Sequence, residues 1–409
     1  MTRVTSFPKS EIRVLLLESI HPVGIERLER EGFDVRVHPG AMDPEQLVEE
    51  IAGVHLLGIR SKTRITPEVI TAADRLLGIG VFGIGTNQVD LIPACRAGVP
   101  VFNAPHANTR SVAELVVGLT VMLLRGLYDK ITAAHAGTWE KSASGSVEVR
   151  GKTLCIVGYG HIGQQVSVLA EALGMRVIFH DVIDKLPMGN AKQAASLEEA
   201  LSAADVVTLH VPSDPSTHHL IDEAALRALR PTAHVINTSR GTVVDIQALA
   251  NALDRGDVAG AALDVFPEEP RARGDEFDLP LRGRPNVLLT PHIGGSTLEA
   301  QHGIGQEVAE KLVRFTNNGS TQGAVNFPEV TLADVTDHHR ILHVHENVPG
   351  VLHEVNELFA RGDVNVEQQV LRTLNDVGYL VVDVDDKCTM DMVKALRELP
   401  HTIRARPLF

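Results

Sequence analysis

Three glycines near the middle of the chain constrain its fold more than any other feature. Gly158, Gly160 and Gly163 form the pattern G-x-G-x-x-G, directly after the apolar run LCIV and at the start of an amphipathic stretch that stops at Gly174. The next apolar run ends in an acid, Asp181. A strand, a glycine-rich turn, a helix and a second strand ending in an acid are typical of a dinucleotide-binding βαβ unit.

Each glycine of this fingerprint has its own predicted purpose. The first allows a tight turn, the second lets a pyrophosphate approach the backbone, and the third lets helix and strand pack closely. The N-terminus of the helix offers free N–H groups to the phosphates. Asp181 is placed to accept hydrogen bonds from the adenosine ribose hydroxyls and to repel a 2′-phosphate. The sequence therefore predicts NAD as the cofactor, in preference to NADP.

The fingerprint lies far from the N-terminus, and an alternation of strand and helix patterns precedes and follows it. Apolar strand-like runs begin with IRVLLLE at 12–18 and continue to NVLLTPH at 286–292. Such alternation predicts parallel sheets, so we expect an α/β protein with two Rossmann-like, doubly wound domains. Between them, Thr109 or Ser111 is expected to cap a long apolar helix that ends near Arg125.

The last part of the chain has a different pattern. Strand-like and helix-like runs follow one another as βαββαβ, with the two middle strands joined by a turn at Asp376–Gly378. This order predicts a small α+β domain. The expected division is a substrate-binding domain from residues 1–107 and 296–335, an NAD-binding domain from residues 108–295, and a C-terminal domain from residues 336–409.

Composition narrows the class of partner and the compartment. The formal net charge of −14 disfavours a nucleic-acid or anionic-membrane partner, because both require clustered positive charge. The 3 cysteines are scattered, which favours a reducing cytoplasm over a disulfide framework. No run approaches the roughly 20 apolar residues that span a bilayer.

Three charged or titratable residues follow predicted strands at the places where α/β proteins bind ligands. They are Arg240 in NTSRGTVVD, Glu269 in DVFPEEP and His292 in LLTPHIGGST. Singly, each has an ordinary structural explanation, as a carbonyl cap, a solvated loop charge or a turn histidine. As a set they suit hydride transfer between NAD and a 2-hydroxy acid. Histidine exchanges the hydroxyl proton, a carboxylate raises its pKa, and a guanidinium binds the substrate carboxylate.

These motifs resemble the D-isomer-specific 2-hydroxyacid dehydrogenases. The further segments RSKTRIT, GIGTNQVDL and VFNAPHANTRSVAELV are similar to the branch that oxidises 3-phospho-D-glycerate in the first step of L-serine biosynthesis. The resemblance implies Arg240, Glu269 and His292 as the catalytic set. It implies NAD contacts at Gly158, Gly160, His161, Ile162, Gly163, Asp181, Thr238, Ser239, Arg240, Asp264, His292, Gly294 and Gly295. It implies substrate contacts at Arg60, Ser61, Asn108 and Gln301.

The segment that contains Arg60 also has a chemical reason to bind an anion. Arg60, Lys62 and Arg64 follow a predicted strand and form a local cationic spot in an acidic chain. A solvated loop is the ordinary alternative. Relatives of this branch often carry lysine at the position of Pro39, so a phosphate clamp that uses this lysine would be incomplete here.

The stretch HVHENVPGVL at 343–352 raises a separate question. His343 and His345 alternate along a predicted strand and share a face, but no further metal ligands have suitable spacing, so no metal is expected. The segment resembles an ACT domain, which implies His345, Asn347 and Asn365 as contacts for L-serine. A structural module is the plainer alternative. Deletion of 336–409 is expected to leave an active enzyme that ignores serine.

Two other functions remain open at this stage. One is a hydroxypyruvate or glyoxylate reductase of the same family, and the other is an NADH-sensing corepressor that binds protein partners. For the enzyme we expect a homotetramer that assembles through nucleotide-domain and ACT-domain contacts. Trp139, the only tryptophan, is expected at a subunit contact.

Overall fold

The computed structural model describes residues 7–270, 274–334 and 339–408. The chain forms two compact units, Met1–Ala107 together with Gln301–Phe409, and Asn108–Ala300. We call them the outer unit and the inserted unit, because the second interrupts the sequence of the first. The division into three domains at the boundaries expected from the sequence stays a prediction.

The outer unit begins with a five-stranded parallel sheet in the order β2-β1-β3-β4-β5. The chain moves from β1 to β2 on one side and then returns to β3, β4 and β5 on the other. The gap between the ends of β1 and β3 is therefore the topological switch point of this sheet. Its elements are η1 (Lys9–Glu11), β1 (Arg13–Leu16), α1 (Pro22–Arg30), β2 (Asp34–Val37), α2 (Pro44–Glu50), β3 (Leu56–Ile59), α3 (Pro67–Ala72), β4 (Gly78–Val81), α4 (Leu91–Arg96), β5 (Val101–Phe102) and, from the C-terminal side of the insertion, most of α11 (Leu298–Asn318).

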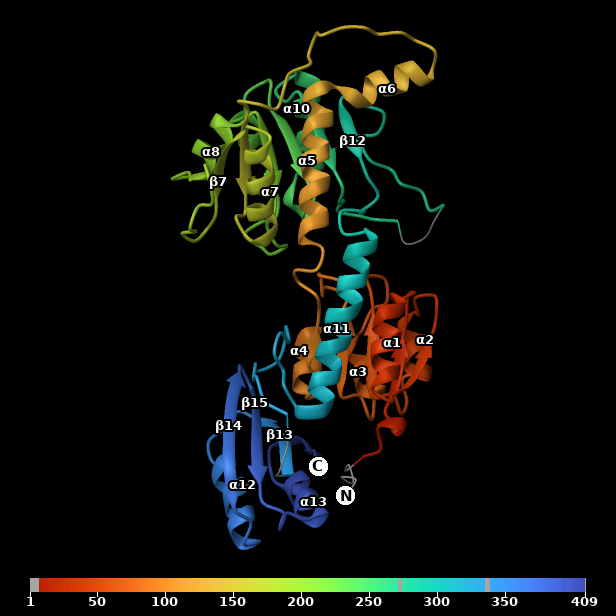
Figure 1. The fold of residues 1–409 in the computed structure, drawn as a ribbon, viewed down its shortest axis with the longest axis vertical. Coiled ribbons are helices and arrows are strands. Elements are labelled where there is room, and N and C mark those ends of the chain that lie inside the picture. The colour runs from red at the N-terminus through yellow and green to blue at the C-terminus, as the bar shows by residue number, and fades with distance from the viewer. Residues whose placement is uncertain (1–6, 271–273, 335–338, 409) are drawn as a thin grey trace. The chain divides into compact units, whose positions relative to one another are not determined.

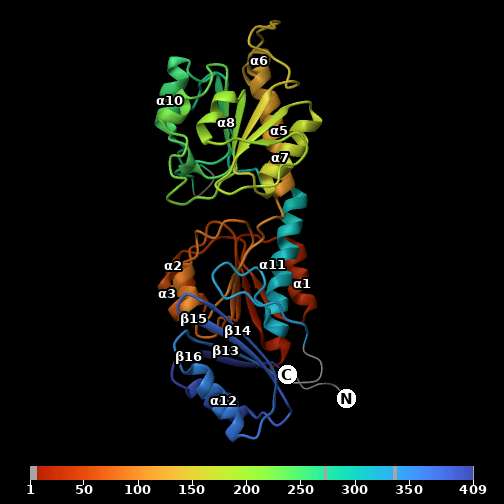
Figure 2. The same ribbon diagram turned by 90° about the vertical axis from the view of Figure 1, so that its left-hand side faces the viewer.

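Helices cover both faces of this sheet, as Figures 1 and 2 show. Leu15 packs on one face with Leu47 of α2 and Val69 of α3. Leu16 points to the other face and packs with Val308 of α11. In β3 and β4, successive residues along the strand are all buried, which is the pattern of a parallel sheet covered on both faces. The sheet is therefore rigid, and only the turns at its strand ends are free to carry ligand groups.

The inserted unit contains a seven-stranded parallel sheet in the order β12-β11-β10-β9-β6-β7-β8. Its switch point lies between β6 and β9. This arrangement confirms the predicted doubly wound, Rossmann-like class. The elements are α5 (Thr109–Arg125), α6 (Leu127–His135), β6 (Thr153–Val157), α7 (His161–Ala172), β7 (Arg176–His180), β8 (Lys192–Gln193), α8 (Leu197–Ala203), β9 (Val206–Leu209), α9 (Glu223–Arg227), β10 (His234–Asn237), η2 (Gly241–Val243), α10 (Ile246–Arg255), β11 (Gly260–Leu263) and β12 (Val287–Leu289).

The long apolar helix α5 belongs to the core of this unit. Its buried side chains, among them Val116 and Leu123, pack with β6 and α7. The cap expected at Thr109 or Ser111 is wrong, because the helix starts one residue earlier than the pattern indicated and Asn108 is the N-cap. No single helix among the described residues is long and apolar enough to cross a membrane. The pair α5 and α6 meets the length and composition limits only together, across a bend of 72°.

The C-terminal part of the outer unit is a four-stranded antiparallel sheet in the order β14-β15-β13-β16. This is the predicted βαββαβ module, although its hairpin turn lies at Asn375–Asp376, one residue before the expected position. Asn375 has a φ of 53°, a backbone conformation that asparagine tolerates better than most residues. The elements are β13 (His339–Glu346), α12 (Val351–Arg361), β14 (Val366–Leu374), β15 (Val377–Val384), α13 (Met390–Glu398) and β16 (Thr402–Leu408).

One face of this sheet packs on α12 and α13, and the other packs on the rest of the outer unit. Leu342, Val344 and Tyr379 point to that second face, where they meet Cys95 and Phe327. The second face is therefore covered within the chain itself.

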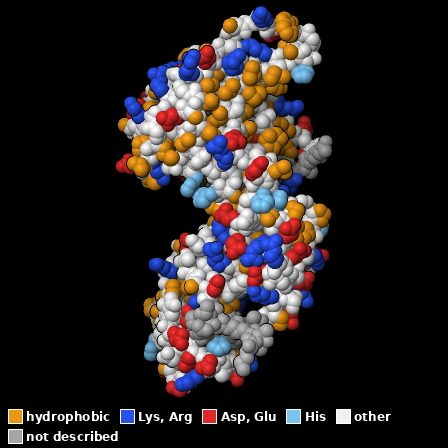
Figure 3. Space-filling view, in the orientation of Figure 1, with side chains coloured by type: hydrophobic (Ala, Val, Ile, Leu, Met, Phe, Trp, Pro, Cys, Tyr) orange, Lys and Arg blue, Asp and Glu red, His pale blue; other side chains and the backbone are white. Residues whose placement is uncertain are grey.

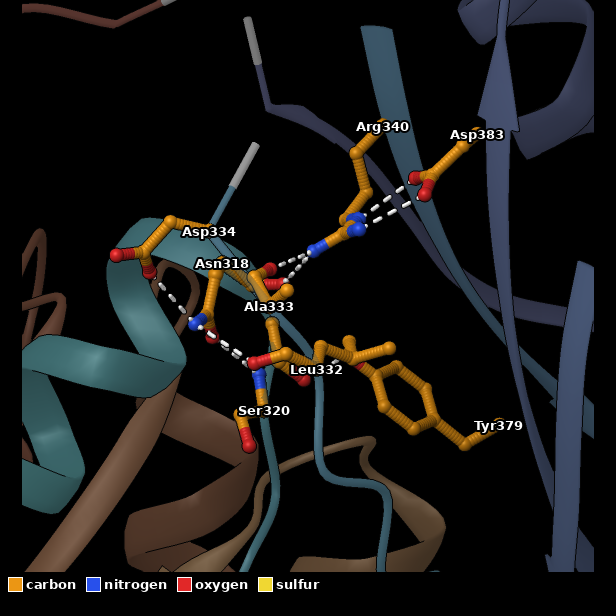
Figure 4. Close-up of polar contacts among 9 residues, drawn as sticks. Asn318, Ser320, Leu332, Ala333, Asp334, Arg340, Tyr379 and Asp383 are labelled. Atoms are coloured by element: carbon orange, nitrogen blue, oxygen red, sulfur yellow. Dashed lines mark hydrogen bonds and ion pairs between the residues drawn. The ribbon is translucent and has the colours of Figure 1, made fainter. Parts of the chain in front are cut away.

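Buried polar contacts fix the same junction (Figure 4). Arg340 makes two hydrogen bonds with Asp383, at 2.6 and 2.8 Å, and both side chains are 3% exposed. Its remaining nitrogen donates to the carbonyl oxygens of Asn318 and Ala333, at 3.1 and 2.8 Å. The Tyr379 hydroxyl donates to the carbonyl oxygen of Gly319 at 2.6 Å. All three nitrogens of the Arg340 guanidinium therefore donate hydrogen bonds, and a buried charge pair that is hydrogen-bonded in this way holds its neighbours in one geometry.

Candidate active site

The inserted unit brings the predicted cofactor residues to one edge of its sheet. Its strands are parallel, so their carboxyl ends lie along the same edge, where α/β proteins bind ligands. The glycine turn follows β6 and leads into α7, which starts at His161 and Ile162. Asp181 follows β7, Thr238, Ser239 and Arg240 follow β10, Asp264 follows β11, and His292, Gly294 and Gly295 follow β12.

The three fingerprint glycines occupy the three environments that the sequence predicted. Gly158 has a φ of 91°, and a Cβ added there would lie 2.5 Å from the carbonyl oxygen of His210. A Cβ added at Gly163 would lie 2.4 Å from the carbonyl oxygen of Gly158. At Gly160 a Cβ would meet nothing within 4 Å. A tight turn, a close packing contact and an open space at the N-terminus of α7 are what a pyrophosphate requires, so these residues fit NAD.

Buried polar atoms at the same edge also indicate a ligand. Thr238 Oγ1, His180 Nδ1 and His210 Nδ1 are buried and have no hydrogen-bond partner within the described part of the chain. Burial lowers the pKa of His210 to about 3, so this imidazole is neutral. Most buried polar atoms in proteins are paired. Such atoms at the ends of β7, β9 and β10, on both sides of β6, are expected where a ligand completes the site.

Asp181 stands at the position expected for a ribose contact. Its carboxylate accepts hydrogen bonds from the backbone N–H of Tyr159 at 2.8 Å and of Ile183 at 3.2 Å. These bonds hold the acid beside the fingerprint turn and leave further acceptor positions on its oxygens. The geometry supports the predicted preference for a ribose that carries no 2′-phosphate.

His292 and Glu269, which the sequence predicted to work together in proton transfer, lie within hydrogen-bond distance. The His292 Nδ1 lies 2.8 Å from a carboxylate oxygen of Glu269, and the side chains are 53% and 37% exposed. The hydrogen bond with Glu269 raises the pKa of His292 above its ordinary value, and the carboxylate charge adds to this effect although burial opposes it. Burial acts to raise the pKa of Glu269, but the hydrogen bond and charge of His292 outweigh it, and that pKa is lowered.

The pair is held rigidly. The second carboxylate oxygen of Glu269 accepts from the backbone N–H of Phe266 at 3.2 Å. His292 has a φ of 53°, which is rare for a residue with a side chain and is found mostly where surrounding structure fixes it. Because Nδ1 faces Glu269, Nε2 is the nitrogen that is left to exchange a proton with a substrate hydroxyl.

Asp264 has a contact set that the sequence did not reveal. It is 1% exposed, and its two oxygens accept from the Thr290 hydroxyl at 2.5 Å and from the backbone N–H groups of Ile293 and Gly294, at 2.9 and 2.8 Å. These bonds fix the turn that carries His292. A direct NAD contact at Asp264 stays a prediction.

Asn237 is a second fixing residue that the sequence analysis missed. It is fully buried at the end of β10 and accepts from the backbone N–H and the hydroxyl of Ser239, at 3.0 and 2.9 Å. Its amide donates to the carbonyl oxygen of Arg240 at 2.9 Å. The signal was present in the sequence, since an asparagine that ends an apolar strand commonly hydrogen-bonds to the following turn.

Arg240 extends from the turn that Asn237 fixes. One nitrogen of its guanidinium donates to the carbonyl oxygen of Ser239 at 2.7 Å. Burial lowers the pKa of Arg240, and the charge of Glu269 works against this shift. A half-buried cation with donors left over is suited to a substrate carboxylate.

The predicted substrate residues belong to both units. Asn108 begins the inserted unit, and its buried Oδ1 has no hydrogen-bond partner among the described residues. Arg60, Ser61 and Gln301 lie in the outer unit. Arg60 is half-buried and Ser61 is exposed, in the turn that follows β3.

The three residues predicted to bind serine do not meet within one chain. The backbone N–H of Asn347 donates to the carbonyl oxygen of Asp376, in the hairpin turn at one end of β15. Asn365 exchanges contacts with Asp385, just beyond the opposite end of β15. His345 pairs with Gly378, so it lies at the Asn347 end. Its Nε2 is buried and has no partner within the described residues.

The neighbouring histidine of that stretch is part of the core. His343 is fully buried and its Nε2 lies 2.8 Å from the Thr402 hydroxyl. Burial lowers the pKa of His343 to about 4, with a smaller contribution from His345. In the described part of the chain, no group of three or more His, Cys, Asp or Glu side chains is placed to hold a metal ion.

Comparisons with known proteins match the chain at two levels. Residues 117–294 match the NAD binding domain of D-isomer specific 2-hydroxyacid dehydrogenases, and residues 341–404 match an ACT domain of the AHAS small subunit-like type. A D-3-phosphoglycerate dehydrogenase of Haemophilus influenzae is 50% identical over 100% of both chains. That of Escherichia coli K12 is 50% identical over 99% of both.

Solved structures extend these matches to the fold. A D-lactate dehydrogenase of Aquifex aeolicus with NAD and lactic acid is 26% identical, has a TM-score of 0.66 and covers 74% of this chain and 95% of its own. An NADPH-dependent glyoxylate/hydroxypyruvate reductase of Sinorhizobium meliloti is 27% identical, has a TM-score of 0.68 and covers 79% of this chain and 100% of its own.

Proposed function

The chain belongs to the D-3-phosphoglycerate dehydrogenases of the D-isomer specific 2-hydroxyacid dehydrogenase family, and from this premise we propose that it oxidises 3-phospho-D-glycerate to 3-phosphohydroxypyruvate with NAD. The observation that carries the proposal is the His292–Glu269 pair, at the same sheet edge as the open space beside Gly160. The reaction is the first step of L-serine biosynthesis, and we place it in the cytoplasm.

The residues of this chain have separate tasks in the proposed reaction. His292 Nε2 takes the proton of the substrate hydroxyl, and Glu269 stabilises the imidazolium that forms. Arg240 binds the substrate carboxylate and polarises the carbonyl that develops. NAD, held by the fingerprint turn and Asp181, supplies the hydride acceptor when bound. In the reverse direction the protonated His292 acts as the acid, and its raised pKa keeps that form available near neutral pH.

The phosphate of the substrate is assigned to the turn after β3. Arg60 is half-buried there and Lys62 is exposed, so both guanidinium and ammonium groups are available to an anion. We therefore expect Arg60→Ala to raise the KM for the phosphorylated substrate strongly.

The test is NADH oxidation with 3-phosphohydroxypyruvate, with hydroxypyruvate and glyoxylate as matched substrates. Preference for the phosphorylated substrate, lost in Arg60→Ala, supports the proposal. Equal or better use of hydroxypyruvate or glyoxylate would establish the second candidate, a reductase like the Sinorhizobium meliloti protein named above. A turnover number of zero with all three substrates would favour the third candidate, an NADH-sensing corepressor.

We further propose that the ACT domain binds L-serine between two copies of the chain. His345 and Asn347 lie at one end of the sheet and Asn365 at the other, so one chain cannot surround a small molecule with all three. The strand β14 is an edge strand with mostly exposed side chains. Antiparallel pairing of two β14 edges would place Asn365 of each copy beside the Asn347 end of the other.

Serine inhibition is tested in the full-length protein. L-serine at millimolar concentration should suppress turnover of the wild type, and His345→Ala and Asn365→Ala should each remove the suppression while leaving turnover unchanged. Inhibition that survives both substitutions would place the serine site elsewhere. Turnover that ignores serine in the wild type would leave the ACT domain with a structural task only.

A homotetramer that also pairs through the inserted unit is the proposed assembly. Figure 3 shows hydrophobic side chains gathered over α5 on the surface of that unit. Tyr128 and Ile131 of α6 are each nearly half exposed, and Trp139 in the following loop is 87% exposed. Large apolar side chains that are exposed together, as they are on α6 and the loop after it, are typical of a contact between subunits. Trp139→Ala should reduce the assembly in sedimentation velocity, and an unchanged tetramer would contradict the proposal.

A further inference from the structure

A single buried carboxylate holds the whole turn that carries Arg60. Glu18 is 8% exposed and lies in the loop between β1 and α1, just after the end of β1. Its two oxygens accept hydrogen bonds from four successive backbone N–H groups, those of Arg60, Ser61, Lys62 and Thr63, at 3.2, 3.0, 2.9 and 2.8 Å. We propose that Glu18 is a positioning residue for substrate binding, which it serves by fixing this turn; the inference rests on the proposed function of Arg60.

The bonds cross the switch point of the outer sheet. Glu18 follows β1, the turn follows β3, and these two strands are neighbours that the chain leaves in opposite directions. Ligands of open α/β sheets bind in the crevice at such a point. Glu18 is therefore located where a bound ligand would be expected, and its carboxylate occupies the anion-binding position itself.

Successive N–H groups that converge on one point form an anion site known as a nest. In this turn the nest is filled by a side chain of the protein. A phosphate or carboxylate of the substrate therefore has no access to these backbone donors and depends on the side chains of the turn. Those side chains point outward, since Ser61 and Lys62 are exposed and Arg60 is half-buried.

Other contacts show that Glu18 is itself fixed. Glu18 and Ser19 both have positive φ values, 66° and 51°, which L-residues adopt only when surrounding contacts require it. The Glu18 N–H donates to the carbonyl oxygen of Gly40 at 3.0 Å, and the Ser19 hydroxyl donates to that of Pro39, also at 3.0 Å. The carboxylate is therefore held by the loop after β2 while it holds the turn after β3.

The carbonyl side of the turn is fixed as well. The side-chain amide of Gln88, which is 8% exposed, donates to the carbonyl oxygen of Arg60. Glu18 binds the N–H of the same residue, so the Arg60 backbone is held on both sides. The direction in which the Arg60 side chain leaves the turn is thus set by buried groups that do not touch the substrate.

Glu18→Gln is the sharpest substitution, because it keeps the size of the side chain. The amide offers one oxygen to the four donors and turns an NH₂ group toward the others, so acceptors are lost and donors face donors. We expect the KM for 3-phosphohydroxypyruvate to rise about tenfold or more, with a smaller change in kcat. The KM for hydroxypyruvate, which has no phosphate, should change much less.

Three variants complete the experiment. Glu18→Asp keeps the charge on a shorter side chain and should give a KM between wild type and Glu18→Gln. Glu49→Gln removes an exposed carboxylate of α2 in the same unit and should leave all constants unchanged. In the double variant Glu18→Gln/Arg60→Ala, the rise in KM should be clearly smaller than the product of the two single effects, because Glu18 acts largely through Arg60. Thermal unfolding and the Kd for NADH are measured for each protein.

The outcomes separate this inference from the proposed function. If Arg60→Ala leaves the KM for the phosphorylated substrate unchanged, the assignment of the turn to the phosphate is wrong. If Arg60→Ala raises this KM and Glu18→Gln does not, the positioning role is wrong. Equal losses with both substrates, or additive effects in the double variant, would show a general structural role and overturn the inference. Should Glu18→Gln fail to fold, the same comparisons are made with Glu18→Asp.

Discussion

The two parallel sheets of this protein treat their switch points in opposite ways. In the inserted unit, the turn after β6 has open space at Gly160, and polar atoms at the ends of β7, β9 and β10 have no protein partner among the described residues. In the outer unit, the corresponding place is filled by Glu18, which satisfies four backbone donors. The same topology thus gives one edge that is open to an anion and one that is closed by an internal anion.

The difference separates two ways of binding a phosphate. An open edge binds phosphate through backbone N–H groups and a helix N-terminus, which glycine makes accessible. A closed edge binds through side chains whose direction is fixed by the groups behind them. Binding through backbone N–H groups suits a cofactor that many enzymes share. Binding through side chains suits a substrate that differs between members of one family, because a few side chains can be exchanged without rebuilding the turn.

The largest expected effect concerns the chemistry at the open edge. His292→Ala removes the imidazole that is hydrogen-bonded to Glu269, and turnover should fall by about 10²–10⁴-fold. NADH binding, measured by fluorescence titration, should survive, since the fingerprint turn is untouched. Residual turnover within tenfold of the wild type would move the proton transfer to another group.

A second prediction tests whether the space at Gly160 is open for a ligand. Gly160→Ala adds a methyl group that meets no protein atom within 4 Å, so the melting temperature should stay unchanged. The Kd for NADH should rise about tenfold or more, because the methyl group takes the place of the pyrophosphate. Gly163→Ala is the control with the opposite expectation. Its methyl group would collide with the Gly158 carbonyl, so the melting temperature should fall.

The third prediction concerns Asp181, the acid that follows β7 at the open edge. Asp181→Ala removes the carboxylate that we expect to repel a 2′-phosphate, so the ratio of kcat/KM for NADH over NADPH should fall about tenfold. The remaining preference is expected to favour NADH, because no arginine directly follows Asp181 to bind the phosphate. An unchanged ratio would remove Asp181 from the cofactor site.

The smallest effect is a displacement of the pH profile. Glu269 raises the pKa of His292, so the acid form needed for carbonyl reduction persists to higher pH and is lost as pH rises through that pKa. Glu269→Gln removes this effect, and the falling limb of kcat/KM for reduction should move to lower pH. For oxidation, which needs the base form, the rising limb should move in the same direction. A profile that stays in place would mean that another group titrates.

Much of this arrangement followed from local sequence. The glycine spacing predicted the turn at 158–163, and the charged residues that end apolar runs predicted where Arg240, Glu269 and His292 would lie. Strand ends in parallel sheets share an edge, so position along the chain was sufficient to bring them together.

The clamp by Glu18 could not be predicted in the same way. Its donors lie 42 to 45 positions away, and the acid looked like the last residue of an apolar strand. Asp264 was likewise assigned to the cofactor, although its oxygens bind the turn of His292. Both contacts depend on which strands become neighbours, and periodicity does not contain that information. The separation of Asn365 from His345 depends on strand order in the same way.

The covered second face of the C-terminal sheet matters for anyone who wishes to engineer this enzyme. Removal of residues 336–409 would uncover Cys95, Phe327 and Val330 and would leave the carbonyl groups that receive Arg340 without their donor. The truncated protein would then be prone to aggregate and to express poorly, even if its turnover number were unchanged. Under the serine inhibition proposed above, a strain built to overproduce serine would do better with the whole protein and a single substitution at Asn365, which leaves the junction intact.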